Sequence, residues 1–403
     1  MAGSVAGSDT SSVERVQREG VVVRFQADRD VFSEAVSFTV KLLPQRTTLP
    51  ILSGVLLESA GDALTLSSFD YEVSARTEIT ADVEEPGRVL VSGRLLSDIA
   101  AKLPNAPVSV RTEENRVIVS AGSAKFTLLS MPVEEYPSLP LVEGITGSVP
   151  AEDFALAVSQ VVVAASRDDV TPVITGVQLE MTGNDLDLIA TDRYRVAVRR
   201  IPWDAGGATE QTLTALVPAR TLQEIGRTFG SSGTIDLVIA KGDDRELIAF
   251  RSGKRTVTSL LIKGNFPPVK RLFPESVDHY AVIATSDLIE ATNRVQTVLD
   301  REAALRFTFE EGTVTLEAAG SEQAQASEQV DILLTGGDTV VSLKPQFLLD
   351  GLRSLHSEFA RLSFTKTDNP NKPGPVLITS QRSRDDEGAL SYRYLLQPNL
   401  LLR

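Results

Sequence analysis

The sequence predicts an α+β fold made of three tandem copies of one unit. Two observations predict this class: a strand-hairpin pattern recurs along the chain, and a strand-to-helix pattern recurs after it in each copy. A chain of 403 residues is also longer than most single domains, which agrees with three domains of about 125 residues each.

The hairpin pattern is the clearest repeat. Residues 172–196 align with residues 50–74 without a gap, at an offset of 122 residues, so that Asp192 falls on Asp70. Apolar and polar residues alternate on both sides of a turn, as in a hairpin with one buried face. A third copy is weaker. The turns are expected at Gly61-Asp62, Gly183-Asn184 and Glu311-Gly312.

Each copy also predicts two helices. One helix opens each copy, from Asp30, Ala151 and Ser286, after acidic, proline or serine residues that are typical of helix N-termini. The other follows a short strand-like run at a constant spacing of 126 residues, with Val91, Val217 and Leu343 in equivalent positions. We therefore predict a disordered polar tail over residues 1–20 and domains over 21–144, 145–277 and 278–403.

The sequence offers little catalytic chemistry. It has no cysteine, two histidines far apart, no phosphate-binding loop, and none of the common nucleophile or metal-protease motifs. Acidic pairs such as Asp168-Asp169 are more typical of a solvated surface. We expect a non-enzyme with no catalytic residue, metal or cofactor. The absence of a secretory signal and of a long apolar run predicts a cytoplasmic protein without a membrane partner.

Four segments give the sequence its resemblance to a known family. They are residues 46–57 (RTTLPILSGVLL), 125–140 (KFTLLSMPVEEYPSLP), 190–196 (ATDRYRV) and 265–274 (NFPPVKRLFP). Together with the repeat they resemble the β subunit of bacterial DNA polymerase III, the β sliding clamp, particularly its actinobacterial forms. The resemblance covers the chain from about residue 21 to its end. It implies three clamp-type domains that close head to tail as a homodimeric ring with pseudo-sixfold symmetry.

The resemblance also implies function and partners. Such a ring encircles duplex DNA without sequence specificity and tethers the replicative polymerase for processive synthesis. Its partners would be the DNA polymerase III α subunit, the clamp loader δ subunit, and other polymerases and repair proteins with short hydrophobic motifs. It would lie in the cytoplasm, associated with the nucleoid through its DNA.

A net charge of −14 requires that any DNA binding be confined to a local basic track. Basic residues recur in equivalent places of the copies, before the first hairpin strand and on the second helix, although Gln346 replaces arginine in the third copy. Arg46 matches a DNA-contacting arginine of the family. The expected DNA-binding residues are Arg46, Arg94, Lys102, Arg167, Arg220, Arg227, Arg301 and Arg353.

The resemblance further implies a pocket for glutamine-leucine-leucine-phenylalanine motifs between the second and third domains. The residues carried over to it are Ile174, Gly176, Thr191, Tyr194, Arg195, Val196, Pro267, Arg271, Leu272, Phe347, Leu395, Gln397, Pro398 and Asn399. Gln397 departs from the family, which commonly has methionine there, and Leu400 replaces its terminal arginine. We expect this difference to alter the preference among motifs.

At the ring joint, the resemblance implies an edge strand with an aromatic plug, Phe126, beside Lys125, and an aliphatic receptor at Val298-Leu299. The alternative from another class is a repeat-built extracellular β-rich binding protein. Such a protein normally carries a secretion signal and exposed aromatic residues. Aromatic residues make up only 5% of this chain, with Trp203 its single tryptophan, which argues against the alternative.

Overall fold

The computed structural model describes residues 23–43, 47–144, 146–206, 212–230, 233–241, 245–300, 303–319, 324–365, 373–383 and 388–399. The predicted tail over residues 1–20 lies outside these ranges. The chain divides into two compact units, one comprising Met1–Ser68 and Thr77–Tyr136, the other Phe69–Arg76 and Pro137–Arg403. Each unit is described by itself.

The same order of elements occurs three times, as a strand, a helix, a run of strands, a second helix and three final strands. The first repeat contains β1 (Arg24–Ala27), α1 (Arg29–Lys41), β2 (Gly54–Ala60), β3 (Ala63–Phe69), β4 (Val73–Thr80), β5 (Asp82–Glu85), β6 (Gly87–Ser92), α2 (Gly93–Ala100), β7 (Val108–Glu113), β8 (Arg116–Ala121) and β9 (Ala124–Met131). The second contains β10 (Gly147–Pro150), α3 (Ala151–Val161), β11 (Gly176–Thr182), β12 (Asp185–Thr191), β13 (Arg195–Pro202), β14 (Leu213–Pro218), α4 (Ala219–Phe229), β15 (Thr234–Lys241), β16 (Glu246–Ser252) and β17 (Arg255–Leu260). The third contains β18 (Tyr280–Ala284), α5 (Thr285–Val295), β19 (Leu305–Glu310), β20 (Thr313–Ala319), β21 (Gln325–Thr335), β22 (Thr339–Leu343), α6 (Pro345–Arg353), β23 (Phe359–Phe364), β24 (Val376–Gln381) and β25 (Ala389–Leu396).

The three predicted hairpins are confirmed. They are β2–β3, β11–β12 and β19–β20, all antiparallel. A glycine in each turn has a positive φ, 61° at Gly61, 58° at Gly183 and 80° at Gly312, a conformation that side chains with a Cβ rarely adopt. The helices were also predicted. The first one begins at Arg29, because Asp28 caps it by accepting hydrogen bonds from the Asp30 and Val31 amides.

The repeat extends to a turn that follows the hairpin. Asp70 and Asp192 each accept hydrogen bonds at Oδ1 from the amides two and three residues later, at 2.9 and 2.7 Å in the first repeat and 3.0 and 3.1 Å in the second. Between them Tyr71 and Arg193 have positive φ angles of 73° and 80°. An Asx-type turn of the same geometry therefore occurs twice, 122 residues apart.

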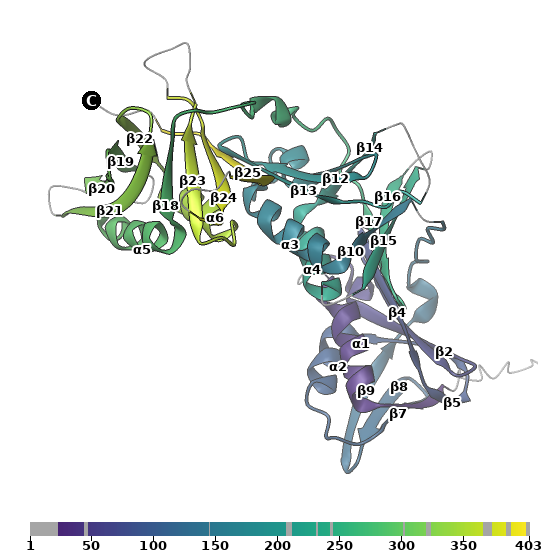
Figure 1. Ribbon diagram of the computed structural model, residues 1–403. Helices are drawn as coiled ribbons and strands as arrows, with labels where there is room; N and C mark the ends of the chain where they lie inside the picture. The colour runs from purple at the N-terminus through teal and green to yellow at the C-terminus, as the bar shows by residue number, and fades with distance from the viewer. Residues whose placement is uncertain are drawn as a thin grey trace, which may run out of the picture. The chain divides into compact units, whose positions relative to one another are not determined.

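In the first unit the strands pair antiparallel around one apolar core. β2 pairs with β3 and β6, and β7 pairs with β1 and β8. Helices α1 and α2 pack against each other (Figure 1). The core includes Phe25, Phe32, Leu57, Leu96 and Val119, which are all buried.

In the second unit one sheet of twelve strands runs through two repeats, in the order β14-β11-β12-β13-β25-β24-β23-β18-β21-β20-β19-β22. The β13–β25 pairing joins the second repeat to the third, with Val196 opposite Leu395. Helices α3, α4, α5 and α6 contact these strands from one face of the sheet (Figure 1). Residues 261–274, the first part of the connection from β17 to β18, cross the opposite face and are called the strap below.

Within the described residues no helix is long and apolar enough to cross a membrane. The same residues contain no group of three acidic or histidine side chains arranged to hold a metal ion.

Candidate functional site

Arg195 is the centre of a polar junction between the second and third repeats. Its Nε lies 2.9 Å from Asp192 Oδ2, and its Nη1 lies 2.6 Å from Asp350 Oδ2 and 3.2 Å from the Tyr394 hydroxyl. The guanidinium also stacks over the Phe347 ring at 4.4 Å. The Arg195 side chain is only 7% exposed, so β13 and α6 are held together by a buried charged contact.

Burial and pairing set the charge state of this junction. Burial alone would lower the pKa of Arg195, but Tyr394 and Asp350 outweigh it and the pKa is raised. Burial raises the pKa of the Tyr394 phenol far above its usual range, so Tyr394 stays neutral and can donate its proton. That hydroxyl donates to the Phe347 carbonyl oxygen at 2.8 Å. Arg195 therefore keeps its positive charge, with acceptors on several sides.

A cavity of about 430 Å³ opens beside this junction. Its lining is mostly polar and charged, and Ile174, Tyr194 and Phe347 give it apolar and aromatic surfaces for a short amphipathic segment. The Tyr194 ring, which is 59% exposed, stacks against Phe347 with 6.0 Å between the ring centroids. The cavity is lined by Ala165, Ser166, Arg167, Asp168, Thr171, Ile174, Asp192, Arg193, Tyr194, Arg195, Gln346, Phe347 and Asp350.

The structure brings four of the residues expected in the peptide pocket to this cavity: Ile174, Tyr194, Arg195 and Phe347. Val196 and Leu395 point to the other face of the sheet, where they are buried with Val269 and Phe273 of the strap. The strap also carries three expected residues, the half-buried Pro267 and the exposed Arg271 and Leu272.

Thr191 and Gly176 are parts of the scaffold. Thr191 is buried and donates its hydroxyl to the Arg195 carbonyl oxygen at 2.8 Å, which fixes the turn before β13. A Cβ on Gly176 would lie 2.8 Å from Ile262 and 2.9 Å from Leu216. The glycine therefore allows these side chains of the same chain to pack, and it is not among the residues that line the cavity.

The C-terminal segment crosses the ends of these strands. The Gln397 amide donates to the Tyr194 carbonyl oxygen at 2.8 Å, and its side-chain Nε2 donates to the Pro373 carbonyl oxygen at 3.2 Å. Pro398 is buried, and the Asn399 amide donates to the Ser342 carbonyl oxygen. Gln397 is thus tied to backbone on two sides. Leu400 lies outside the described residues.

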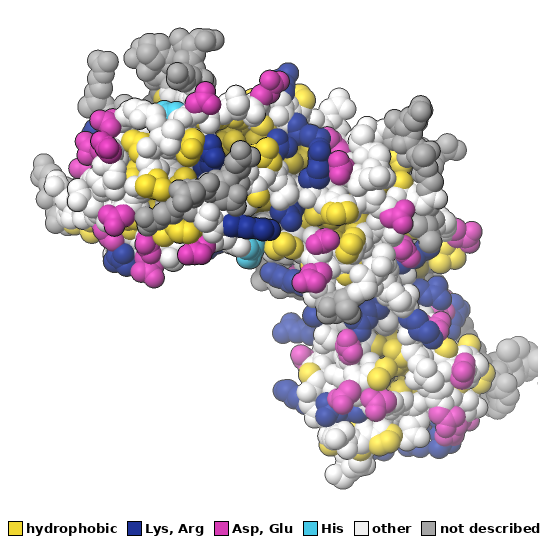
Figure 2. All heavy atoms as spheres, in the orientation of Figure 1, with side chains coloured by type: hydrophobic (Ala, Val, Ile, Leu, Met, Phe, Trp, Pro, Cys, Tyr) yellow, Lys and Arg dark blue, Asp and Glu magenta, His cyan; other side chains and the backbone are white. Residues whose placement is uncertain are grey.

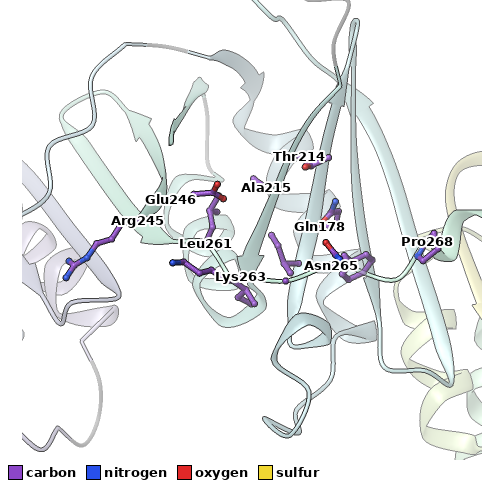
Figure 3. A pocket seen from close by; sticks show the side chains of 13 residues that line it. Gln178, Thr214, Ala215, Arg245, Glu246, Leu261, Lys263, Asn265 and Pro268 are labelled. Atoms are coloured by element: carbon purple, nitrogen blue, oxygen red, sulfur yellow. The ribbon is translucent and has the colours of Figure 1, made fainter. Parts of the chain in front are cut away.

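A second cavity, of about 700 Å³, lies beside the first half of the strap (Figure 3). Its walls include Gln178 of β11, Thr214 of β14 and Glu246 of β16, with Leu261, Lys263 and Asn265 on the strap. Sequence reasoning missed this cavity, although Asn265, Phe266 and Pro268 of its lining belong to the 265–274 segment that carries the resemblance.

Four of the eight expected DNA-binding residues, Arg94, Arg220, Arg227 and Arg353, lie exposed on the second helix of a repeat. Arg94 and Arg220 are the second residues of α2 and α4, and Gln346 is the second residue of α6, as the alignment of the copies predicted. The expected residues Lys102 and Arg167 are exposed as well. Arg227 pairs with Glu224 at 2.9 Å, and Arg167 also lines the cavity beside Arg195. Arg46 and Arg301 lie outside the described residues.

The residues expected at the ring joint lie on β9 and after α5. Lys125 is exposed, while Phe126 is half-buried and packs partly on the core of the first unit. Val298 and Leu299, at the end of the short 3-10 helix Gln296–Val298, are half-buried. Leu129 on β9 was missed, although it is 69% exposed. An apolar residue at this place in an edge strand was the available signal.

The comparisons with other proteins agree with the repeat. Three family models match in order: the N-terminal domain of the DNA polymerase III beta subunit over residues 23–140, its central domain over 148–268 and its C-terminal domain over 270–383. The chain is 44% identical over 377 residues to the beta sliding clamp of Streptomyces coelicolor, covering 93% of this chain and 99% of that one. It is 44% identical over 312 residues to the beta sliding clamp of Micrococcus luteus, covering 77% of this chain and all of that one.

A solved structure agrees as well. The sliding clamp of Pseudomonas aeruginosa bound to griselimycin superposes with a TM-score of 0.84 at 26% identity, covering 94% of this chain and 100% of that chain. The repeat, the fold and these relatives point the same way: the chain belongs to the DNA polymerase III beta subunit family, the β sliding clamps of DNA replication, and to its actinobacterial branch.

Proposed function

We propose that two copies of this chain close head to tail into a ring around duplex DNA, and that the ring holds a polymerase on DNA without catalysing a reaction itself. Sliding-clamp function follows from the family. The relatives give no support to the alternative of an extracellular β-rich binding protein. The cytoplasm and a ring associated with the nucleoid through DNA are part of the proposal.

The main support for ring closure is the pairing of β13 with β25 between the second and third repeats. β13 joins β25 of the next repeat, and the equivalents of these two strands are β21 in the third repeat and β9 in the first. Along residues 124–129, β9 pairs only with β8 among the described strands. Along residues 325–331, β21 pairs only with β20 in the same part of the chain. Within the described residues, the first and third repeats therefore each have a strand with a free edge along these stretches, β9 and β21, as a head-to-tail ring requires.

The helices support DNA holding without sequence specificity. Exposed Arg94, Arg220, Arg227 and Arg353 belong to helices that back onto sheets. Side chains presented in this way reach phosphates rather than base edges. Each contact is then weak and screened by salt, which suits a ring that must move along DNA.

The cavity beside Arg195 supports capture of short partner motifs. Tyr194, Phe347 and Ile174 offer apolar and aromatic contacts, and Arg271 and Leu272 stand exposed on the strap. We infer that peptides of the polymerase III α subunit, the clamp loader δ subunit and other polymerases and repair proteins bind at this junction, with one part in the cavity and another against the strap. A fluorescent peptide with a Gln-Leu-Leu-Phe core should raise its anisotropy on binding the full chain. A peptide that stays free would contradict this site.

Light scattering tests the ring. We expect the wild-type chain at twice its mass of 43.4 kDa. Phe126→Arg places a charge where the edges meet and should leave monomers, because burying an unpaired charge is costly. Since Phe126 also packs on the core, Leu129→Asp is the second variant, at a side chain that is exposed in the single chain. Asn105→Arg, exposed and outside β9, is the control that should stay dimeric. Variants of Phe126 and Leu129 that both remain dimers would contradict this joint.

A further inference from the structure

The strap is fixed to the sheet unevenly along its length. Its first half is held by backbone contacts, such as the Ile262 amide to the Leu216 carbonyl oxygen at 2.8 Å, and it borders the cavity of about 700 Å³ (Figure 3). Its second half contains a single 3-10 turn, Val269–Leu272, followed by Phe273. Val269 and Phe273 pack on Val196 and Leu395. The two halves are therefore attached differently, the first by backbone hydrogen bonds and the second by apolar side chains.

A row of charged residues lies under that turn, on the face of the sheet opposite the helices. Glu180 stands directly opposite Asp187, and Asp187 directly opposite Arg200, on three neighbouring strands. Arg200 binds Asp187 through Nε at 2.7 Å and through Nη2 at 2.9 Å. Lys270 of the strap completes the row, with its Nζ at 2.7 Å from both Glu180 Oε2 and Asp187 Oδ2.

Asp187 is the buried centre of this row, with 4% of its side chain exposed. Burial alone would raise the pKa of its carboxyl, but hydrogen bonds from Arg200 and Lys270 outweigh burial, and the pKa lies below its usual value. Figure 2 shows Lys and Arg side chains gathered beside acidic ones where Figure 1 places β12 and β13. A buried carboxylate needs its partners in place, and Lys270 is the partner that the strap supplies.

The first repeat shows that the hairpin does not require this row. There Thr65 stands opposite Glu58, in the position that Asp187 holds opposite Glu180. The first repeat also has a 3-10 turn after its last strand, Val133–Glu135, and the Tyr136 hydroxyl there donates to the Gly54 carbonyl oxygen at 3.2 Å. The charged centre thus distinguishes the second repeat, where it lies under a segment that carries residues expected in the peptide site.

We propose that Lys270 is a positioning residue: its ion pairs with Glu180 and Asp187 set the place of the 3-10 turn, and thereby hold Arg271 and Leu272 as a wall for partner peptides. The inference rests on the proposed peptide site. Lys270 itself touches the row and not the peptide. In a turn of four residues, a shift of Lys270 moves the two residues after it.

Peptide anisotropy on the full dimeric chain tests the proposal, with the Gln-Leu-Leu-Phe peptide as probe. Lys270→Met keeps the apolar stem and removes the charge, and we expect the peptide affinity to fall roughly three- to thirtyfold. Lys270→Arg should restore most of the affinity, because it keeps the charge. Lys263→Met is the matched control, because Lys263 lies on the same strap but lines the cavity of about 700 Å³ instead of joining the charged row. It should leave the peptide affinity unchanged.

A double-mutant cycle with Leu272→Ala separates positioning from general destabilisation. If Lys270 acts through Leu272, Lys270→Met should cause little further loss of peptide affinity in the Leu272→Ala background. The two substitutions should then show a clear coupling free energy. Additive losses, or Lys270→Met binding as tightly as wild type, would overturn the positioning role while leaving the peptide site in place. A wild-type chain that does not bind the peptide would overturn the site and the positioning role together.

Discussion

The first and second repeats share a backbone and differ in what their strands carry. Both have the hairpin and the aspartate-capped turn after it, at Asp70 and at Asp192. The third residue after that aspartate is Val73 in one repeat and Arg195 in the other. Arg195 binds across to Asp350 of the third repeat, whereas Val73 is an ordinary strand residue.

This difference locates the charged contacts that distinguish the second repeat from the first. The duplicated backbone supplies the scaffold, and two replacements, at Arg195 and Asp187, create a polar junction on one face of the sheet and an anchored strap on the other. Arg195 contacts the third repeat directly, and Asp187 contacts the strap that leads to it. The proposed partner site is therefore a property of a junction between repeats rather than of the repeated unit.

The largest effect should come from truncating the two equivalent residues. Arg195→Ala leaves Asp350 and Asp192 without their cation and should cost about 3 to 5 kcal/mol of stability in the second unit. Val73→Ala should cost about 1 kcal/mol, as for an ordinary truncation. Fluorescence of the single tryptophan, Trp203, reports denaturant unfolding of the second repeat, and circular dichroism reports the whole chain. Equal losses at the two positions would remove the contrast between the repeats.

A smaller effect, with a pH signature, is expected at Asp187. Asp187→Asn should cost about 1.5 to 3 kcal/mol at neutral pH, since it weakens charged hydrogen bonds from Arg200 and Lys270. The pKa of this carboxyl is lowered in the folded chain, so its contribution is complete above about pH 4 and is lost as the pH falls through the folded pKa. The stability gap between wild type and variant should be constant from about pH 5 to pH 9 and narrow in more acid buffers.

Thr65→Asn, at the equivalent place in the first repeat, is the control, and it should change stability little and without this pH dependence. A gap that widens on acidification would show that the pKa of this carboxyl is raised in the folded chain, contrary to its contacts.

The smallest effect tests what the repeats share. A Cβ would lie 2.7 Å from Leu90 at Gly54 and 2.8 Å from Ile262 at Gly176, with a carbonyl oxygen at 3.0 Å in both places. Gly54→Ala and Gly176→Ala should therefore each cost about 1 kcal/mol by overpacking. Thermal unfolding of both variants checks this. A neutral Gly176→Ala beside a costly Gly54→Ala would mean that the two strands are packed differently.

Much of the fold could be predicted from the sequence because its signals are local. The turns at Gly61, Gly183 and Gly312 lie between alternating strands, and the helices other than α5, which follows Ala284, have a polar or proline residue before them. The start of the first helix was placed one residue late, since Asp28 rather than Asp30 caps it. Local chemistry fixes such features to within a residue or two.

The site could be predicted only in part, because its decisive contacts join distant residues. Arg195 and Asp350 are 155 positions apart, and Lys270 and Asp187 are 83 positions apart. The resemblance located Arg195 but could not show that its guanidinium forms buried ion pairs with Asp192 and Asp350. The only sequence signal for Asp187 was its place as an acidic residue among the apolar residues of 186–189. Such a residue does not by itself indicate which side chain pairs with it.

The retention of the loaded protein on circular and on linear DNA tests whether it forms a closed ring around the duplex. A closed ring cannot leave a nicked circular plasmid but slides off the ends of a linear one of the same sequence. We predict that, after loading and a wash in high salt, the protein stays on the circle and is lost when a restriction enzyme linearises the plasmid. Equal retention on both forms would contradict a ring around DNA.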